Sequence, residues 1–217
     1  TEPTLTIEAV GPKQWDRVRA LRLASLREDP QSFFELLSEE IGLTEDEWRA
    51  RLASVNTWVA VLDGVDVGVV TSSPDRENPT AAHLSGLWVA PAGRRRRTAV
   101  ALSGAVVERA GSEGFRRVVL WVASANHGAD ALYAGLGFTR TGRTDTFKPP
   151  RDLYTEWVLE LVLEQGGNRR RGVSLRPGGD GWPSSRSVGV WPPGVAAGSR
   201  GWGGWPGAAP WAERAPP

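Results

Sequence analysis

With 217 residues, 40% of them hydrophobic, and a formal net charge of +1, the chain is long enough for one ordinary domain and a short appendage. Cysteine is absent, which excludes disulfides, thiolate catalysis and cysteine-based zinc sites, and with His83 and His127 as the two imidazoles we expect no metal site. No apolar run approaches the roughly 20 residues that span a bilayer, and Thr1–Thr6 lacks a signal-peptide pattern, so we expect no membrane partner and a cytoplasmic location.

The first part of the chain predicts one strand and two helices. Leu5–Val10 has the pattern of a short strand, and apolar residues recur at helical spacing in the segment Trp15–Leu21. A second helix is expected to begin after Thr44, because Thr44 and Glu47 have the spacing of a capping box. We expect a loop between these two helices.

The next elements are a hairpin, a strand-helix-strand unit, and a short helix followed by two strands. Asp63 and Gly64 favour a tight hairpin turn, because this dipeptide readily adopts positive φ angles. The strand-helix-strand order implies two parallel neighbours joined by a right-handed crossover, and therefore an α/β (α+β) fold with a mixed sheet. Strands are expected over 58–62, 65–71, 84–89, 118–122, 138–146 and 153–163, and helices over 98–110 and 126–135.

The composition changes abruptly at Gly166. Residues 166–217 are rich in Gly, Pro, Arg, Ser and Trp and lack aliphatic periodicity, so we predict one domain in residues 1–165 and a disordered tail in 166–217. The tail has seven arginines against Asp180 and Glu213, which leaves residues 1–165 with a net charge of −4. This acidic balance makes nucleic acid an unfavourable partner for the domain and suits a cationic substrate.

We therefore expect the tail to be dispensable for folding. Truncation after Gln165 should leave the melting temperature nearly unchanged, because the removed residues have no apolar periodicity with which to pack on a core. Thermal unfolding of the full chain and the truncated chain tests the boundary. A loss of several kcal/mol, rather than tenths, would place the boundary elsewhere.

An arginine run stands directly before the helix expected over 98–110. The run Arg94–Arg97 follows a predicted strand and precedes Thr98. A helix start leaves several backbone N–H groups unpaired, and together they can hold a phosphate group. A solvated basic loop is the alternative interpretation.

A second motif surrounds one of the two tyrosines of the chain. Asn126 is followed by the segment Ala131–Phe138, which reads Ala-Leu-Tyr-Ala-Gly-Leu-Gly-Phe and contains Tyr133. Asn126 also suits the N-cap of the short helix expected to follow it.

These two segments resemble motifs of the GNAT superfamily of N-acetyltransferases. Its acetyl-CoA loop, Gln/Arg-x-x-Gly-x-Gly/Ala, falls on Arg94–Ala99, with Arg97 in place of the central glycine. Its Asn…Ala-x-x-Leu-Tyr-x-x-Leu-Gly-Phe signature falls on Asn126 to Phe138. The resemblance, which runs from Leu5 to Glu164, implies a mostly antiparallel mixed sheet with a splayed parallel strand pair, flanked by helices, and acetyl-CoA bound between the splayed strands.

The resemblance implies an N-acetyltransferase that acetylates a small-molecule or peptide amine, with a homodimer left open. Since no cysteine is available for a covalent acetyl-enzyme, we expect direct attack by the amine in a ternary complex. A backbone N–H of the strand 87–89 is the expected oxyanion donor. The implied cofactor contacts are Leu87, Trp88, Val89, Arg94, Arg95, Arg96, Arg97, Thr98, Ala99, Asn126 and Tyr133.

Tyr133 is the expected proton donor, because a phenol can protonate the departing thiolate. The alternative is a packing role among its apolar neighbours. The base is harder to assign from sequence. His83 and Glu40, with Glu39 beside it, are the candidates. An ordinary buried or exposed role is favoured for His83, and a role as solvated charges is equally plausible for the two glutamates.

Two other functions remain open at this stage. Arg97, in place of the family glycine, and Phe34, where the resembling subgroup leads us to expect glycine, are compatible with a GNAT domain that binds its cofactor poorly. The arginine run and the Arg- and Trp-rich tail are also compatible with a nucleic-acid-binding protein, through charge and base stacking.

Overall fold

The computed structural model describes residues 3–33, 35–146 and 155–164. The tail predicted for 166–217, Phe34 and the first two residues of the strand expected over 153–163 lie outside the described residues. Within the described part, no helix has the length and apolar character needed to cross a membrane.

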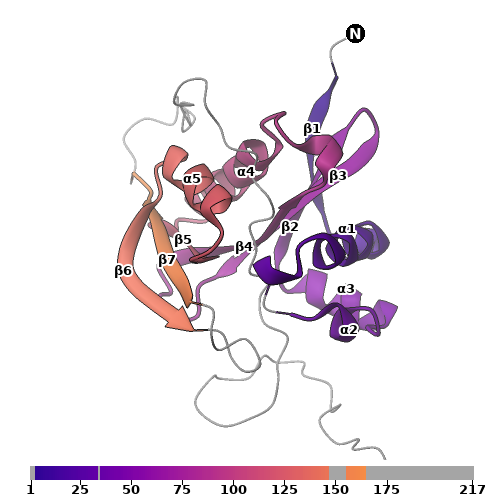
Figure 1. Ribbon diagram of the computed structural model, residues 1–217, viewed down its shortest axis with the longest axis horizontal. Coiled ribbons are helices and arrows are strands. Elements are labelled where there is room, and N and C mark those ends of the chain that lie inside the picture. The colour runs from indigo at the N-terminus through magenta and orange to yellow at the C-terminus, as the bar shows by residue number, and fades with distance from the viewer. Residues whose placement is uncertain (1–2, 34, 147–154, 165–217) are drawn as a thin grey trace, which may run out of the picture.

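A seven-stranded sheet forms the centre of the domain, in the order β1-β2-β3-β4-β5-β7-β6 (Figure 1). Neighbouring strands are antiparallel except for β4 and β5, which are parallel. This confirms the predicted α/β class with a mostly antiparallel mixed sheet. The strands are β1 Leu5–Val10, β2 Asn56–Leu62, β3 Val65–Pro74, β4 Ala81–Val89, β5 Arg117–Ala123, β6 Thr139–Thr146 and β7 Thr155–Val162.

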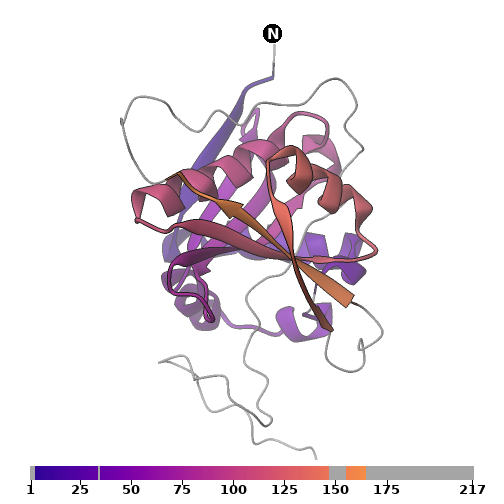
Figure 2. The same ribbon diagram turned by 90° about the vertical axis from the view of Figure 1, so that its left-hand side faces the viewer.

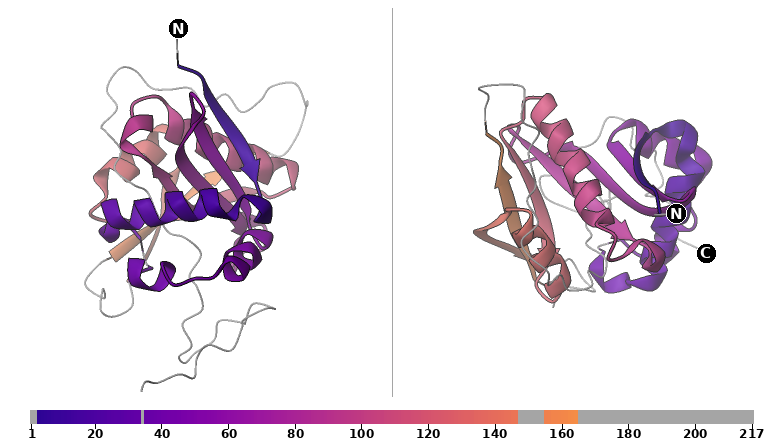
Figure 3. Two further views of the ribbon diagram at one scale, coloured as in Figure 1. Left: turned by 90° about the vertical axis from the view of Figure 1, so that its right-hand side faces the viewer. Right: turned by 90° about the horizontal axis from the view of Figure 1, so that it is seen from above.

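Helices cover both faces of the sheet. Two of them, α1 and α3, lie against β3 and β2 on one face, and α4 crosses the other face from β1 to β5 (Figures 1 and 3). Strands β6 and β7 lie at the edge of the sheet opposite β1, nearest the viewer in Figure 2. The helices are α1 Trp15–Glu28, α2 Leu37–Glu40, α3 Glu45–Ala53, α4 Thr98–Ser112 and α5 His127–Gly135.

Strand β2 shows how the sequence builds two separate cores. Its side chains alternate, so that Val59 and Val61 join the core beneath α1 and α3, whereas Trp58 and Ala60 join the core beneath α4 and α5. In the core beneath α1 and α3, Trp48 is completely buried. Both faces of the central strands are therefore covered, as the long apolar runs predict.

Strands β4 and β5 are paired at their first residues. Backbone pairing joins Ala81–His83 to Arg117–Val119. Beyond His83, the described residues of β4 and β5 are not paired with each other. The register between β3 and β4 also shifts within Val69–Thr71, near Gly86, which has a φ of 63°. The two parallel strands thus separate toward their carboxyl ends, which is the splayed pair that the resemblance implies.

Several elements differ from the sequence expectation, among them β3, which extends to Pro74 rather than Thr71. Strand β4 begins at Ala81 rather than Leu84, because its first residues pair with both β3 and β5. The expected loop between α1 and α3 contains the short helix α2, which is too brief to show periodicity in sequence. Glu39 accepts a hydrogen bond from the Leu36 backbone N–H at its start (3.2 Å), which stabilises this turn locally.

Candidate active site

The start of α4 presents a group of unpaired backbone donors. Arg95 and Arg97 have φ angles of 60° and 61°, and Arg97 is the N-cap of the helix. Within the described residues, no hydrogen-bond acceptor contacts the backbone N–H groups from Arg95 to Val100, and the ladder begins with the bond from Ala101 N–H to the Arg97 carbonyl (2.9 Å). Unpaired N–H groups at the positive end of a helix dipole form an anion site.

The four arginines before α4 do not point to one place. The Arg94 guanidinium donates from Nε to the Val89 carbonyl (3.0 Å) and from Nη2 to Glu28 on α1 (2.6 Å). Arg94 therefore ties the loop to the domain, whereas Arg95, Arg96 and Arg97 are exposed. The hydroxyl of Thr98 donates a hydrogen bond to the Gly93 carbonyl (2.7 Å). Ala99, the next expected cofactor contact, is half-buried in the first turn of α4.

The strand segment Leu87–Val89 offers its backbone rather than its side chains to the gap beside β5. Leu87 and Val89 are buried in the core beneath α4, and Trp88 is buried in the core beneath α1 and α3. The expected cofactor contacts from these three residues are consequently limited to main-chain atoms along the unpaired edge of β4.

Tyr133 lies almost completely buried on α5. Its ring packs at a tilt against Phe138, with the ring centroids 5.2 Å apart, and 1% of the residue is exposed. The hydroxyl forms no hydrogen bond within the described residues, and burial raises the pKa of the phenol above its usual value near 10. The phenol is therefore protonated and neutral at physiological pH.

Asn126 joins the start of α5 to the segment between α1 and α2. Its Oδ1 accepts a hydrogen bond from the Ala129 backbone N–H (3.1 Å), which caps the helix as expected from sequence. Its Nδ2 donates to the hydroxyl of Ser32 (3.2 Å). The segment that follows α1 is thereby held beside the carboxyl end of β5.

His83 lies at the closed end of the splayed pair. It is paired with Val119 and its ring packs edge-on against Trp121, with the ring centroids 4.6 Å apart. Burial, together with the charge of Arg76, lowers the pKa of His83 to about 4. The imidazole is neutral at physiological pH, but it lies away from the open end where β4 and β5 separate.

Glu40, the other candidate base, belongs to a buried ion-pair network. Both carboxylate oxygens accept hydrogen bonds from Arg51 on α3 (2.9 and 2.8 Å), and Arg22 on α1 lies 3.6 Å away. Glu39 is exposed and caps α2. Neither carboxylate therefore has the free, enclosed lone pairs that a base needs.

Two glutamates that the sequence analysis did not select as candidate bases are better placed for that role than His83 and Glu40. Glu35, from the segment after α1, is 6% exposed and accepts a hydrogen bond at Oε2 from Arg22 (2.7 Å), while its Oε1 has no partner within the described residues. Burial raises the pKa of Glu35 to about 7, although Arg22 opposes the rise.

Glu156, on β7, is 7% exposed, and its buried Oε1 also has no partner within the described residues. Burial, and then the nearby charges of Asp145 and Glu35, raise the pKa of Glu156 to about 8. The sequence signal for Glu156 was an acidic residue within an apolar strand; Glu35 had no such signal, because its burial depends on Arg22.

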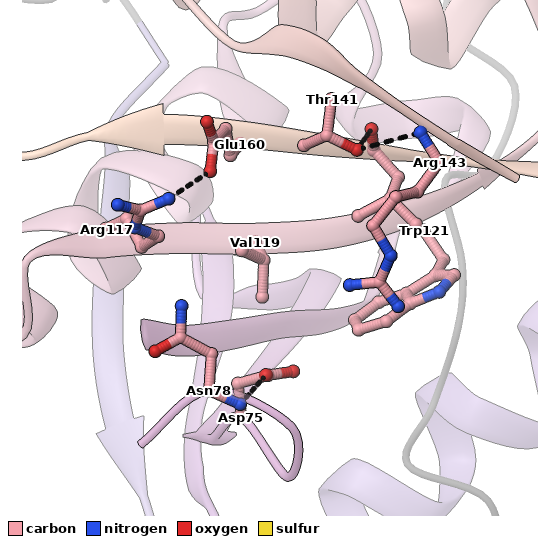
Figure 4. Close-up of a pocket in the computed structure, with 9 residues that line it drawn as sticks. Asp75, Asn78, Arg117, Val119, Trp121, Thr141, Arg143 and Glu160 are labelled. Carbon is pink, nitrogen blue, oxygen red and sulfur yellow. Dashed lines mark hydrogen bonds and ion pairs between the residues drawn. The ribbon is translucent and has the colours of Figure 1, made fainter. Parts of the chain in front are cut away.

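A cavity of about 280 Å³ is lined largely by residues of β5, β6 and β7 (Figure 4). Strands β5 and β7 pair Ala123 with Glu156 and Trp121 with Val158, and directly paired residues share a face. Trp121 and Val158 contribute to the apolar part of the wall. The lining residues are Asp75, Asn78, Arg117, Val119, Trp121, Thr141, Arg143, Val158 and Glu160.

The rim of this cavity is made of ion pairs. Arg117 donates to Glu160 (2.8 Å), and Arg143 donates to Glu77 (2.6 Å). Asp75 is buried and accepts from the backbone N–H groups of Glu77 and Asn78 (3.2 and 2.7 Å). The cavity and Glu156 thus lie on the same face of β5 and β7, opposite the core beneath α4 and α5.

Comparison with known proteins gives a consistent result. The family model described as acetyltransferase (GNAT) family matches residues 22–138. A curated relative, N-acetylaspartate synthetase of Danio rerio, is 36% identical over 93 residues, which are 43% of this chain and 33% of the relative. The chain therefore matches about a third of the length of that relative.

Solved structures share the fold. An N-acetyltransferase from Staphylococcus aureus has a TM-score of 0.63 at 16% identity, covering 74% of this chain and 99% of its own. A protein from Salmonella typhimurium, solved with its cofactor acetyl-CoA, has a TM-score of 0.61 at 17% identity, covering 76% of this chain and 97% of its own.

Proposed function

We propose that this chain, which belongs to the GNAT acetyltransferase family, is an N-acetyltransferase that uses acetyl-CoA, and that the acceptor amine attacks directly in a ternary complex. The observation that carries the proposal is the run of unpaired backbone N–H groups from Arg95 to Val100, next to the point where β4 and β5 separate.

The residues at this point fit acetyl-CoA. The N–H groups at the start of α4 would hold the pyrophosphate, and the exposed guanidiniums of Arg95, Arg96 and Arg97 add positive charge. The unpaired edge of β4 leaves main-chain groups to hydrogen-bond the pantetheine arm. When bound, acetyl-CoA supplies an acetyl thioester whose carbonyl carbon accepts the amine.

The chain's own groups then handle charge and protons. A backbone N–H along the Leu87–Val89 edge of β4 would stabilise negative charge on the thioester oxygen. Tyr133 holds a proton on its hydroxyl and would deliver it to the departing sulfur. Because the chain contains no cysteine, it offers no thiol for an acetyl-enzyme, and direct transfer is favoured.

The acceptor would be a small-molecule or peptide amine that approaches the face of β5 and β7 that carries the cavity. The net charge of −4 over residues 1–165 attracts a cation, and Glu156 and Glu35 provide carboxyl groups on this side of the sheet. Trp121 and Val158 supply an apolar surface on which the rest of the acceptor can lie.

Two measurements test this function. Calorimetry with acetyl-CoA should give saturable one-site binding, and free CoA release should rise above the acceptor-free background with at least one amine in a panel of polyamines, amino acids, peptide N-termini and aminoglycosides. Absence of acetyl-CoA binding would refute the cofactor assignment. Binding without transfer to any amine in the panel would contradict the proposed acceptor class.

Arg97→Gly is expected to tighten acetyl-CoA binding severalfold. Arg97 has a φ of 61°, where an L side chain costs about 1 kcal/mol or more and glycine does not, and its Cβ stands beside the donors at the helix start. Isothermal titration at two salt concentrations measures the change. The matched control is Arg96→Gly, which removes the same charge from a residue without a positive φ.

The opposite outcome has a clear physical meaning. A charge-assisted guanidinium contact is worth about 1.5 to 3 kcal/mol, so Arg97→Gly would weaken binding roughly tenfold or more if Arg97 contacts a phosphate. Weaker binding with a shallower salt dependence than in the Arg96→Gly variant would make Arg97 a cofactor ligand.

A further inference from the structure

We propose that Glu156, with Glu35 beside it, receives the ammonium group of the acceptor and that Glu156 takes its proton, an inference that rests on the acetyl transfer proposed above. Glu156 is then a catalytic residue, and Glu35 is a positioning residue that holds negative charge next to it.

Strand register places Glu156 at the open end of the splayed pair. Glu156 is paired with Ala123, the last residue of β5, whereas β4 and β5 are joined at the opposite end, at His83 and Val119. Residues 157, 159 and 161 pack toward the core beneath α4 and α5, so the alternating Glu156 projects to the opposite face of the sheet. The carboxyl group therefore lies on the side from which an acceptor reaches the gap between β4 and β5.

Glu35 reaches the same place from another element. The hydrogen bond from Asn126 to Ser32 holds the segment after α1 against the start of α5, directly beyond the end of β5. Arg22 fixes one oxygen of Glu35 through a buried ion pair (2.7 Å). The second oxygen of Glu35 and one oxygen of Glu156 are enclosed and have no partner within the described residues. Two such acceptors are costly unless a donor meets them, and an ammonium group supplies three donors.

Charge counting supports a cationic ligand. The charged groups that face the pair are Asp145 on β6, paired directly with Glu156, and Arg22, Glu40 and Arg51 on the three helices near Glu35. Arg51 pairs with Glu40, and Arg22 pairs with one oxygen of Glu35. Glu156 and Asp145 are left without a cation within the described residues, and the charge of Asp145 adds to the burial that raises the pKa of Glu156 to about 8.

This raised proton affinity suits the chemistry. An alkylammonium group has a pKa near 10, and a carboxylate of ordinary pKa near 4 would accept its proton poorly. In the proposed step one N–H bond of the ammonium breaks, the proton goes to Oε1 of Glu156, and the electron pair stays on nitrogen for attack on the acetyl carbon. After the attack, a second N–H proton leaves the same nitrogen and goes to the Tyr133 oxygen, where it replaces the proton that Tyr133 gives to the sulfur. The products are an amide, a free thiol and one proton, which Glu156 returns to water.

Glu156→Gln is expected to lower kcat/KM about 10²-fold at pH 8 and to abolish the acid limb of the pH profile, while acetyl-CoA binding measured by calorimetry stays within about threefold. Glu35→Gln removes a neighbouring charge, so it should move the acid limb to lower pH and leave kcat at high pH within about threefold. Glu8→Gln, on the far strand β1, is the control and should leave both the rate and the profile unchanged.

A readout without turnover separates this inference from the proposed function. Carbon-13 NMR of labelled glutamate in the free protein should show Glu156 titrating above pH 6.5, and Glu156→Gln should raise the melting temperature at pH 8.5 but not at pH 5. Titration of Glu156 below pH 5.5, or activity of Glu156→Gln within threefold of the parent with an unchanged pH profile, would overturn the inference. Failure of the parent chain to transfer acetyl groups would instead refute the proposed function.

Discussion

Tyr133→Phe is expected to lower kcat by about 10² or more and to change acetyl-CoA binding by less than about threefold. The substitution removes one hydroxyl from a ring that is 1% exposed and packed against Phe138, so the ring contacts persist. A single positioned general acid contributes about 10²- to 10⁴-fold, and a group that acts only as the sulfur departs affects kcat rather than ground-state binding.

Single-turnover kinetics and calorimetry measure the two quantities separately. Phe138→Leu is the matched control, because it alters the packing around the same ring and keeps the hydroxyl; it should lower stability and leave the single-turnover rate within a few-fold. If the Tyr133→Phe rate stays within twofold of the parent where chemistry limits turnover, Tyr133 is a packing residue and the proton donor lies elsewhere.

Local sequence signals predicted most of the fold because each has a short-range physical cause. Thr44 and Glu47 form the expected capping box, with Glu47 accepting from Thr44 N–H at 2.7 Å and Thr44 accepting from Glu47 N–H at 3.3 Å. Asp63 and Gly64 form the expected turn, both at positive φ. Helix α2 was missed because four residues are too few to show helical periodicity, and one of its contacts, the pairing of Glu40 with Arg51, comes from another helix.

The candidate site was only partly predictable for the same reason. The helix start after Arg97 and the cap at Asn126 follow from adjacent residues, and sequence placed both. The direction of a guanidinium does not follow from adjacent residues: Arg94 turns to Glu28, which is 66 positions earlier. Glu35 and Glu156 are 121 positions apart, and only the folded chain brings their segments to the same end of β5, through the Asn126–Ser32 hydrogen bond and the pairing of Glu156 with Ala123.

Arg22→Met is expected to cost about 3 to 5 kcal/mol of unfolding free energy near pH 8, because removing one partner of a buried ion pair leaves an uncompensated charge. Arg22 is 1% exposed and lies between Glu35 (2.7 Å) and Glu40 (3.6 Å), with Phe33 beneath its guanidinium (4.8 Å to the ring centroid). Methionine keeps most of the apolar packing, so the loss reports mainly on charge.

The pH dependence of this loss identifies its source. The pKa of Glu35 in the folded protein is raised to about 7. A carboxyl group whose pKa is higher in the folded than in the unfolded state stabilises the fold fully below its unfolded pKa, near 4.5, and this stabilisation is lost as the pH rises. Without Arg22 the pKa rises further, so the deficit of the variant should be larger at pH 8 than at pH 5. Urea unfolding at both pH values measures it. The control is Arg109→Met, which breaks an exposed pair with Glu113 and should cost less than about 0.5 kcal/mol at either pH. A deficit for Arg22→Met that is below 1 kcal/mol or independent of pH would mean that Glu35 and Glu40 find other partners, and that the charge balance argued for the glutamate pair is wrong.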